Sequence, residues 1–107
     1  MALRDRVAAR KSPTHGKGVF AKARLREGQY IGTFEGRETD SDGTYVLWLV
    51  EEDGSEMGIE GRNDLRFLNH SQQPNAELRD LDLHATRNIQ PGAEIFIDYG
   101  EAWEDVE

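Results

Sequence analysis

Runs of β-branched, aromatic and other apolar residues recur along the chain between more polar stretches. Such runs favour β-strands, because branched and aromatic side chains pack well on a pleated surface. We predict strands at residues 18–21, 30–34, 45–50, 56–59, 76–81, 83–87 and 94–98. The chain therefore has the pattern of a protein built from short strands.

Turn-forming pairs separate several of these runs. The two Asp-Gly pairs, at residues 42–43 and 53–54, suit tight hairpins because Gly adopts a positive φ without steric cost. The Pro-Gly pair at residues 91–92 suits a type II turn directly before the last predicted strand. These pairs support the strand prediction.

One segment has the pattern of a helical turn. In residues 63–70, Asp64 is placed to cap the turn, and Leu65 and Leu68 lie three residues apart on one face. No segment shows a long, capped helical period. We therefore predict an all-β or β-dominated fold made of small twisted sheets.

The composition indicates one globular domain. A chain of 107 residues with 36% hydrophobic and 32% charged residues can bury one modest core, so we expect residues 1–107 to form a single domain. It contains no cysteine, which excludes disulfides and thiolate zinc sites. No signal-peptide pattern or membrane-spanning run is present, so we expect a cytoplasmic or nuclear protein without a membrane partner.

Charge is distributed unevenly along the chain. Residues 1–26 contain eight Lys or Arg and one acidic residue, a net charge of +7, so the remainder carries −15 and the whole chain −8. An acidic body attracts basic ligands and repels nucleic acid, whereas the basic segment can contact phosphate or pair with the acidic body. This balance favours a basic protein over nucleic acid as the partner.

Three clusters of glycine and polar residues are candidate sites, at residues 15–18, 66–75 and 94–100. Each also has a purely structural explanation. Gly16 and Gly18 can serve a positive φ or a close backbone approach. The polar residues of the second cluster can hydrogen-bond the backbone of an irregular turn, and Tyr99 can be a half-buried aromatic. Singly, none of the clusters identifies a function.

In their order and spacing, the three clusters resemble the motifs of the SET domain family of protein lysine methyltransferases. Its Gly-x-Gly motif corresponds to SPTHGKGVFAK, its Asn-His-Ser motif to GRNDLRFLNHSQQPN and its terminal motif to ATRNIQPGAEIFIDYG. The resemblance extends over residues 7–103. It implies small β-sheets with a C-terminal pseudoknot, in which a terminal segment passes through a loop near the Asn-His-Ser motif.

The chain departs from the family pattern in three respects. Many members carry Cys after Asn-His-Ser, where this chain has Gln72, and the cysteine-rich flanks that bind zinc are missing, so we expect no metal. The segment between Tyr45 and Asn63 leaves little room for the insertion that often grips the substrate peptide. A domain this small favours a homodimer, in which a second copy completes the substrate channel.

The resemblance implies methyl transfer from S-adenosylmethionine to the ε-amine of a lysine, with S-adenosylhomocysteine as the product. The residues that it places at the cofactor are Gly16, Lys17, Gly18, Arg66, Phe67, Asn69, His70, Tyr99 and Trp103. Trp103 occupies a position where members often carry an aromatic that packs on adenine. A core or interface tryptophan explains Trp103 equally well.

The resemblance also implies a catalytic role for Tyr99, whose hydroxyl would orient the amine. Tyr45 is the second catalytic candidate, as another wall of the lysine channel; its alternative is a strand residue that faces the core. Ile97 precedes Tyr99 by two positions, where an aromatic often limits the number of methyl groups added. An aliphatic residue there favours multiple methylation.

The acidic body favours a basic, lysine-containing substrate such as a histone-like or ribosomal protein. Two other functions stay open. One is a non-catalytic SET-like module that binds cofactor or peptide. The other is a small β-domain that binds nucleic acid through its basic N-terminal arm, which the acidic body argues against.

Overall fold

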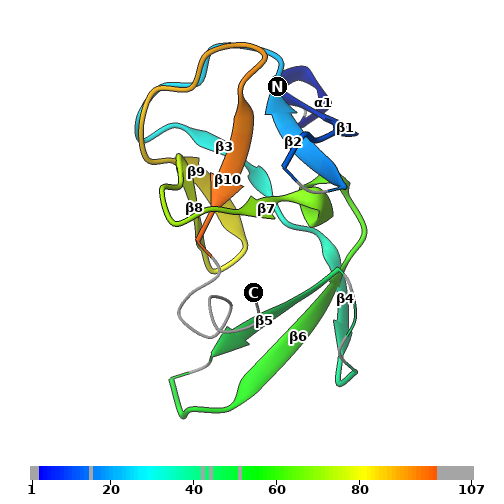
Figure 1. The fold of residues 1–107 in the computed structure, drawn as a ribbon. Helices are drawn as coiled ribbons and strands as arrows, with labels where there is room; N and C mark the ends of the chain where they lie inside the picture. Colours follow the sequence, from blue (N-terminus) through cyan, green and yellow to red (C-terminus); the bar gives the residue numbers. More distant parts are fainter. Residues whose placement is uncertain (1–2, 15, 42, 44, 51, 99–107) are drawn as a thin grey trace.

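The computed structural model describes residues 3–14, 16–41, 43, 45–50 and 52–98, and strands dominate this part of the chain (Figure 1). In chain order the elements are α1 (Leu3–Arg6), β1 (Val7–Lys11), β2 (Lys17–Ala21), β3 (Tyr30–Thr33), β4 (Gly36–Thr39), β5 (Val46–Val50), β6 (Glu56–Gly61), the 3-10 turn η1 (Asp64–Phe67), β7 (Asn69–His70), β8 (Ala76–Arg79), β9 (Asp82–Ala85) and β10 (Glu94–Ile97). The predicted β-dominated fold is confirmed.

The strands form three small sheets. Their strand orders are β1-β2-β10-β7, β3-β9-β8 and β4-β6-β5. Figure 1 shows the β4-β6-β5 sheet at the bottom of the molecule, below the other two. In the first sheet, β10 runs antiparallel to β2 and parallel to β7. This sheet therefore joins segments from the beginning, the middle and the end of the described chain.

All the predicted strands are present, and their ends lie within two residues of the predicted ones. The strands β1, β4 and β7 and the short helix α1 were not predicted. The sequences of β1 (VAARK) and β4 (GRET) carry few apolar side chains, and β7 has only two residues. These segments are strands because they form backbone hydrogen bonds with β2, β6 and β10. The β-propensity of a segment does not predict such pairing with distant strands.

The turns agree with the sequence in two of three places. The Gln90–Ala93 turn is closed by a 3.1 Å bond from the Ala93 N–H to the Gln90 carbonyl, and Gly92 has a φ of +88°, as a type II turn requires. Residues 53–54 lie in the loop of the β5–β6 hairpin. The hairpin predicted at residues 42–43 is wrong, because β6 lies between β4 and β5; residue 42 itself is outside the described residues.

The predicted helical turn is present as η1, but its predicted cap is wrong. The residue at the N-cap position is Asn63 rather than Asp64, and Asn63 makes no side-chain capping bond. Its amide instead donates to the Thr33 carbonyl at 2.8 Å and accepts from the Glu35 N–H at 3.3 Å. Asn63 therefore anchors η1 to the segment between β3 and β4.

The core is built from apolar side chains at alternate positions along the strands. In β10 the side chains of Ile95 and Ile97 are buried, while those of Glu94 and Phe96 are less so. Each fully buried aliphatic side chain contributes about 1.5–3 kcal/mol relative to exposure. Outside the strands, Leu25 and Ile89 exchange backbone hydrogen bonds of 2.9 and 2.8 Å and are both buried. This bridge closes the core beside β10.

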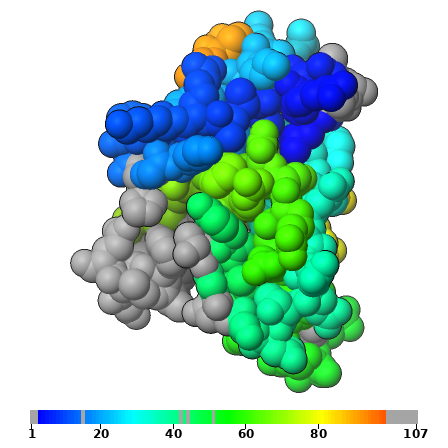
Figure 2. Space-filling view, turned by 90° about the vertical axis from the view of Figure 1, so that its right-hand side faces the viewer, coloured from blue at the N-terminus to red at the C-terminus, as the bar shows by residue number. Residues whose placement is uncertain are grey.

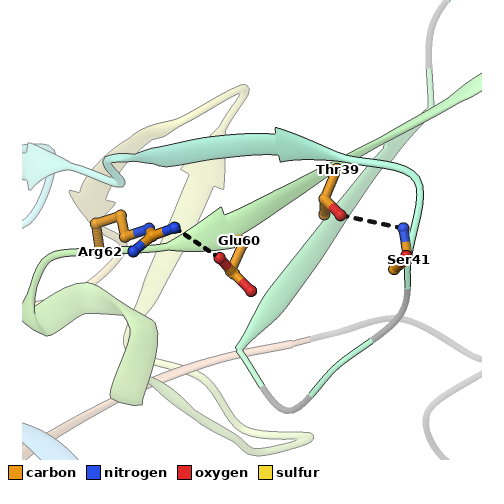
Figure 3. Close-up of polar contacts among 4 residues, drawn as sticks. All are labelled: Thr39, Ser41, Glu60 and Arg62. Carbon is orange, nitrogen blue, oxygen red and sulfur yellow. Dashed lines mark hydrogen bonds and ion pairs between the residues drawn. The ribbon is translucent and has the colours of Figure 1, made fainter.

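The β4-β6-β5 sheet depends on close backbone packing more than on its surface charges. A Cβ at Gly36 would lie 2.1 Å from the Glu60 carbonyl oxygen, so this position of β4 accepts only glycine without a backbone shift. Figure 3 shows the exposed ion pair between Arg62 and Glu60, whose atoms lie 2.9 Å apart. Exposed pairs of this kind stabilise a fold little.

The helical segments in the described part of the chain are far too short and polar to cross a bilayer.

Candidate functional site

The four-stranded sheet brings the three sequence clusters together. Lys17 and Gly18 begin β2, the Asn-His pair forms β7, and the terminal motif forms β10 between these two strands (Figure 1). Phe96 of β10 is aligned with Asn69 of β7, and Ile95 is aligned with Val19 of β2. Clusters far apart in the sequence are therefore neighbours in one sheet.

A buried polar network joins the clusters through side chains. The Asn69 amide group donates to the Lys17 carbonyl at 3.1 Å and to Glu94 Oε2 at 2.8 Å. The Ser12 hydroxyl donates to the other carboxylate oxygen, Glu94 Oε1, at 2.7 Å. Ser12 and Asn69 are only 7% and 8% exposed. Hydrogen bonds to a carboxylate are stronger than those between neutral groups, so this partly buried network ties Ser12, which follows β1, and the strands β2 and β7 to β10.

Both structural roles expected for glycine around the start of β2 are observed: a positive φ at Gly16 and a close approach of other atoms at Gly18. Gly16 has a φ of +46°, and its carbonyl accepts a 2.7 Å bond from the Ser12 N–H. A Cβ at Gly18 would lie 2.3 Å from Glu94 Oε2 and 3.1 Å from Asn69 Nδ2. Because Gly18 has no side chain, the hydrogen bond between Glu94 and Asn69 can occupy this space.

Four predicted site residues form a group of cations and aromatic rings beside this network. The Arg66 guanidinium lies over the Phe67 ring, with Cζ 4.1 Å from the centroid, and the Lys17 ammonium lies 5.1 Å from it. The Tyr45 ring meets Phe67 edge to face, with centroids 5.4 Å apart. Phe67 is nearly buried, whereas Tyr45 is 44% exposed. Two positive charges beside aromatic rings suit the carboxylate group of a ligand.

Residues at the ends of β7 and β10 complete the described part of the site. His70 Nδ1 lies 3.7 Å from Asp98 Oδ1, and the Ser71 N–H donates to the Ile97 carbonyl at 3.0 Å. The Ile97 side chain is 5% exposed and belongs to the core. Its place in a substrate channel stays a prediction. Tyr99 and Trp103 lie outside the described residues, as does the terminal segment of the predicted pseudoknot.

Two residues of this region, Ser12 and Glu94, were not assigned a role from the sequence. The backbone hydrogen bonding expected for polar residues of the second cluster is observed at Asn75. Its amide donates to the Glu94 carbonyl at 2.9 Å and accepts from the Phe96 N–H at 2.8 Å. A carboxylate at the start of an otherwise apolar strand, as in β10 (EIFI), was the signal for Glu94. Its partners become visible only when the strand order is known.

Two further observations concern possible binding sites among the described residues. No group of three or more His, Cys, Asp or Glu side chains among them is arranged to hold a metal ion. An open hollow of about 480 Å³ lies between α1, β3 and the start of η1. Figure 2 shows the blue N-terminal segment packed directly above the yellow-green part of the chain that contains η1. No residue that lines this hollow belongs to the three clusters.

Known proteins share both the sequence pattern and the fold. The family model for the SET domain matches residues 16–100. The histone-lysine N-methyltransferase MEDEA of Arabidopsis thaliana is 30% identical over 112 aligned positions, which cover 83% of this chain and 16% of MEDEA. The chain thus spans a small part of the length of that relative.

A solved structure from Plasmodium falciparum, described as a candidate histone methyltransferase, superposes with a TM-score of 0.70 and 22% identity. The match covers 92% of this chain and 96% of the other, and at this identity it concerns the fold. The SET domain match covers most of the sequence and includes residues 16–18 of the first cluster and all of the other two. The chain therefore belongs to the SET domain family.

Proposed function

We propose that this chain is a protein-lysine N-methyltransferase that transfers a methyl group from S-adenosylmethionine to the ε-amine of a lysine in a basic protein. The observation that carries the proposal is the Asn69 side chain, held between the Lys17 carbonyl and Glu94 where the three clusters meet. Membership of the SET domain family and the similarity to MEDEA, a histone-lysine N-methyltransferase, support the same reaction.

The described residues fit the chemistry of S-adenosylmethionine. The Arg66 and Lys17 cations on Phe67 match a ligand that carries a carboxylate beside apolar atoms. A Cβ at Gly16 would meet no atom of the described residues within 4 Å, so these residues leave the backbone there accessible to a ligand. When bound, S-adenosylmethionine supplies a methyl group on an electrophilic sulfonium. In the proposal the backbone of residues 16–18 holds its methionine end, and Asn69 and His70 meet its polar groups and adenine. Tyr99 and Trp103 complete the cofactor contacts.

The remaining task of the protein is to deliver a neutral amine in line with the methyl group. A free lysine side chain costs about 4.6 kcal/mol to deprotonate at pH 7. A channel with aromatic walls disfavours the ammonium form and lowers that cost. The partly exposed Tyr45 ring offers such a wall, and the Tyr99 hydroxyl would orient the amine. No carboxylate base is needed for this step.

The exposed carboxylates of the β5–β6 hairpin favour a basic substrate, although the Arg66 guanidinium lies beside the Tyr45 ring itself, with Cζ 5.8 Å from its centroid. Tyr45 directly precedes β5, and the β5–β6 hairpin carries the exposed carboxylates of Glu52, Asp53, Glu56 and Glu60. Carboxylates around a binding site raise the local concentration of cationic segments. The proposed substrate is therefore a lysine-rich segment of a histone-like or ribosomal protein. On this proposal the protein acts in the cytoplasm or the nucleus.

A homodimer is part of the proposal. The strand β5 lies at the edge of its sheet, and Val50 on this strand is 72% exposed. Edge strands with exposed apolar side chains tend to pair with another chain. Light scattering at the concentration used for assays should report twice the mass of one chain, and a monomer would remove this part of the proposal.

Methyl transfer from labelled S-adenosylmethionine to a panel of histones and ribosomal proteins tests the proposed reaction. The unmodified chain should label at least one protein, and Tyr99→Phe should reduce the rate about 100-fold or more. Tyr30→Phe is the matched control: Tyr30 lies on β3, where its hydroxyl contacts Thr33, so its loss should leave the rate unchanged.

Two results would contradict the proposed reaction. Calorimetric binding of S-adenosylmethionine with no label above the blank would identify a non-catalytic binding module. Salt-dependent binding of nucleic acid, with no affinity for S-adenosylmethionine, would instead support the nucleic-acid alternative.

A further inference from the structure

We infer that Glu94 is a positioning residue of the cofactor site, which it orders through Asn69 and through Ser12, the residue that contacts Thr14 and Gly16 ahead of β2. This inference rests on the proposed function for its link to S-adenosylmethionine. Its structural basis is that one carboxylate accepts hydrogen bonds from two separate parts of the chain. Oε2 accepts from Asn69 at 2.8 Å, and Oε1 accepts from Ser12 at 2.7 Å.

The first consequence concerns the orientation of the Asn69 side chain. Its NH₂ group faces two acceptors, the Lys17 carbonyl at 3.1 Å and Glu94 Oε2. A rotation of the amide by 180° would turn its oxygen toward both acceptors, and the hydrogen bonds would be replaced by repulsion. An ionised carboxylate only accepts hydrogen bonds, so Glu94 selects one of the two amide orientations. It thereby determines which atom of Asn69 is directed away from β10.

The second consequence concerns the loop that precedes β2. The Ser12 hydroxyl donates to Glu94 and accepts from the Thr14 N–H at 3.0 Å. The Ser12 N–H donates to the Gly16 carbonyl at 2.7 Å. Ser12 is thus held by Glu94 and in turn binds Thr14 and Gly16. The loop carries the backbone that the proposal places at the methionine end of the cofactor, so Glu94 orders both of its contact regions.

Gly18 and Glu94 form a complementary pair in this arrangement. A methyl group at position 18 would lie 2.3 Å from Glu94 Oε2 and 2.9 Å from its Cδ. The Glu94 side chain is flexible and can move away from such a methyl group, but its movement would break the bonds to Asn69 and Ser12. Gly18→Ala should therefore act on the site in the same way as removal of the carboxylate, although residue 18 has no side chain of its own.

The test measures S-adenosylmethionine binding and the side-chain amide signal of Asn69 in the full chain. Glu94→Ala should weaken binding roughly tenfold or more, in line with the loss of a hydrogen bond to a charged group, and should shift the Asn69 NH₂ resonances. Glu94→Gln retains one acceptor oxygen for Asn69 and should bind within about threefold of the unmodified chain. The control Glu77→Ala removes an exposed carboxylate that pairs with Arg79 and should change neither quantity.

A double-mutant cycle separates positioning from general stability. Gly18→Ala should weaken binding in the unmodified chain but add little in the Glu94→Ala background, because the atom that the methyl group meets is then absent. The cycle also provides Gly18→Ala as a second variant if Glu94→Ala fails to fold. Effects of the two substitutions that simply add would overturn the inference, as would a folded Glu94→Ala variant with unchanged Asn69 signals and affinity.

Failure of the proposed function gives a different pattern of results. If the unmodified chain binds S-adenosylmethionine but labels no protein, the methyltransferase proposal fails, while the binding and amide signals still decide the role of Glu94. If the unmodified chain does not bind S-adenosylmethionine, the inference is overturned together with the cofactor assignment.

Discussion

The guanidinium of Arg66 stacks on the ring of Phe67, its neighbour in the sequence, with Cζ 4.1 Å from the ring centroid. Its Nη1 also donates to the Asn63 carbonyl at 3.0 Å, which ties the stack to the start of η1. The short turn thus presents a positive charge and an apolar ring together. Both are properties that the proposed cofactor site uses.

Phe67 should contribute to stability through its ring as well as its burial. Phe67→Leu removes the contacts with Arg66, Lys17 and Tyr45, each worth about 0.5–1 kcal/mol. We expect the free energy of unfolding to fall by about 2 kcal/mol, measured by urea denaturation. Phe20→Leu is the control, since among the described residues the Phe20 ring contacts one cation, Arg10, 5.2 Å from its centroid, and its loss should cost less. Equal losses would contradict the additional role of the Phe67 ring.

Tyr45→Ala distinguishes a channel wall from an ordinary strand-end aromatic. The Tyr45 ring is partly exposed and contacts Phe67 edge to face, so its removal should cost only about 1 kcal/mol of stability. If Tyr45 lines the lysine channel, kcat/KM for the protein substrate should fall at least tenfold, while the affinity for S-adenosylmethionine changes little. Steady-state kinetics combined with calorimetry measure both. An unchanged kcat/KM would support the purely structural alternative.

Asn75 should be among the most sensitive polar positions for stability. Its side chain satisfies the Glu94 carbonyl and the Phe96 N–H of β10, and Asn75→Ala leaves both without that partner. The expected loss is about 2–6 kcal/mol, from roughly 1–3 kcal/mol for each of the two unsatisfied groups. Asn88→Ala is the matched control, because Asn88 accepts one exposed bond from the Glu27 N–H. Thermal denaturation that ranks the two variants equally would contradict the prediction.

The turn of the β5–β6 hairpin should carry a pH dependence of known sign. Hydrogen bonds from the Ser55 hydroxyl and N–H to the Asp53 carboxylate lower the pKa of Asp53 below its ordinary value of 3.8. A carboxyl group whose pKa is lower in the folded state stabilises the folded turn at pH values above its ordinary pKa. This stabilisation is lost as the pH falls through the pKa of the folded state. An NMR titration should show the lowered pKa, and Ser55→Ala should raise it toward 3.8. An Asp53 pKa that is the same in both proteins would contradict this account.

Strands with apolar patterns and well-marked turns could be located from the order of residue types alone. The segments that form β2, β9 and β10 have their own alternation of buried and less buried side chains, and the Pro-Gly pair before β10 specifies its turn through local φ angles. The chemistry of the three clusters was likewise recognisable, because it depends on residue types at short spacings. These features are properties of neighbouring residues in the chain.

Other features depend on which strands lie next to one another. The strands β4 and β7 form because β6 and β10 lie beside them, and Glu94 acquires its role because β10 runs between β2 and β7. Hydrogen bonds between residues 12, 69 and 94 join positions separated by long stretches of chain, and no local propensity encodes such pairs. Residue types thus specified the strands and the candidate chemistry. Only the order of the strands brought the carboxylate oxygens of Glu94 to their donors, because a hydrogen bond requires its two atoms to lie within about 3 Å of each other.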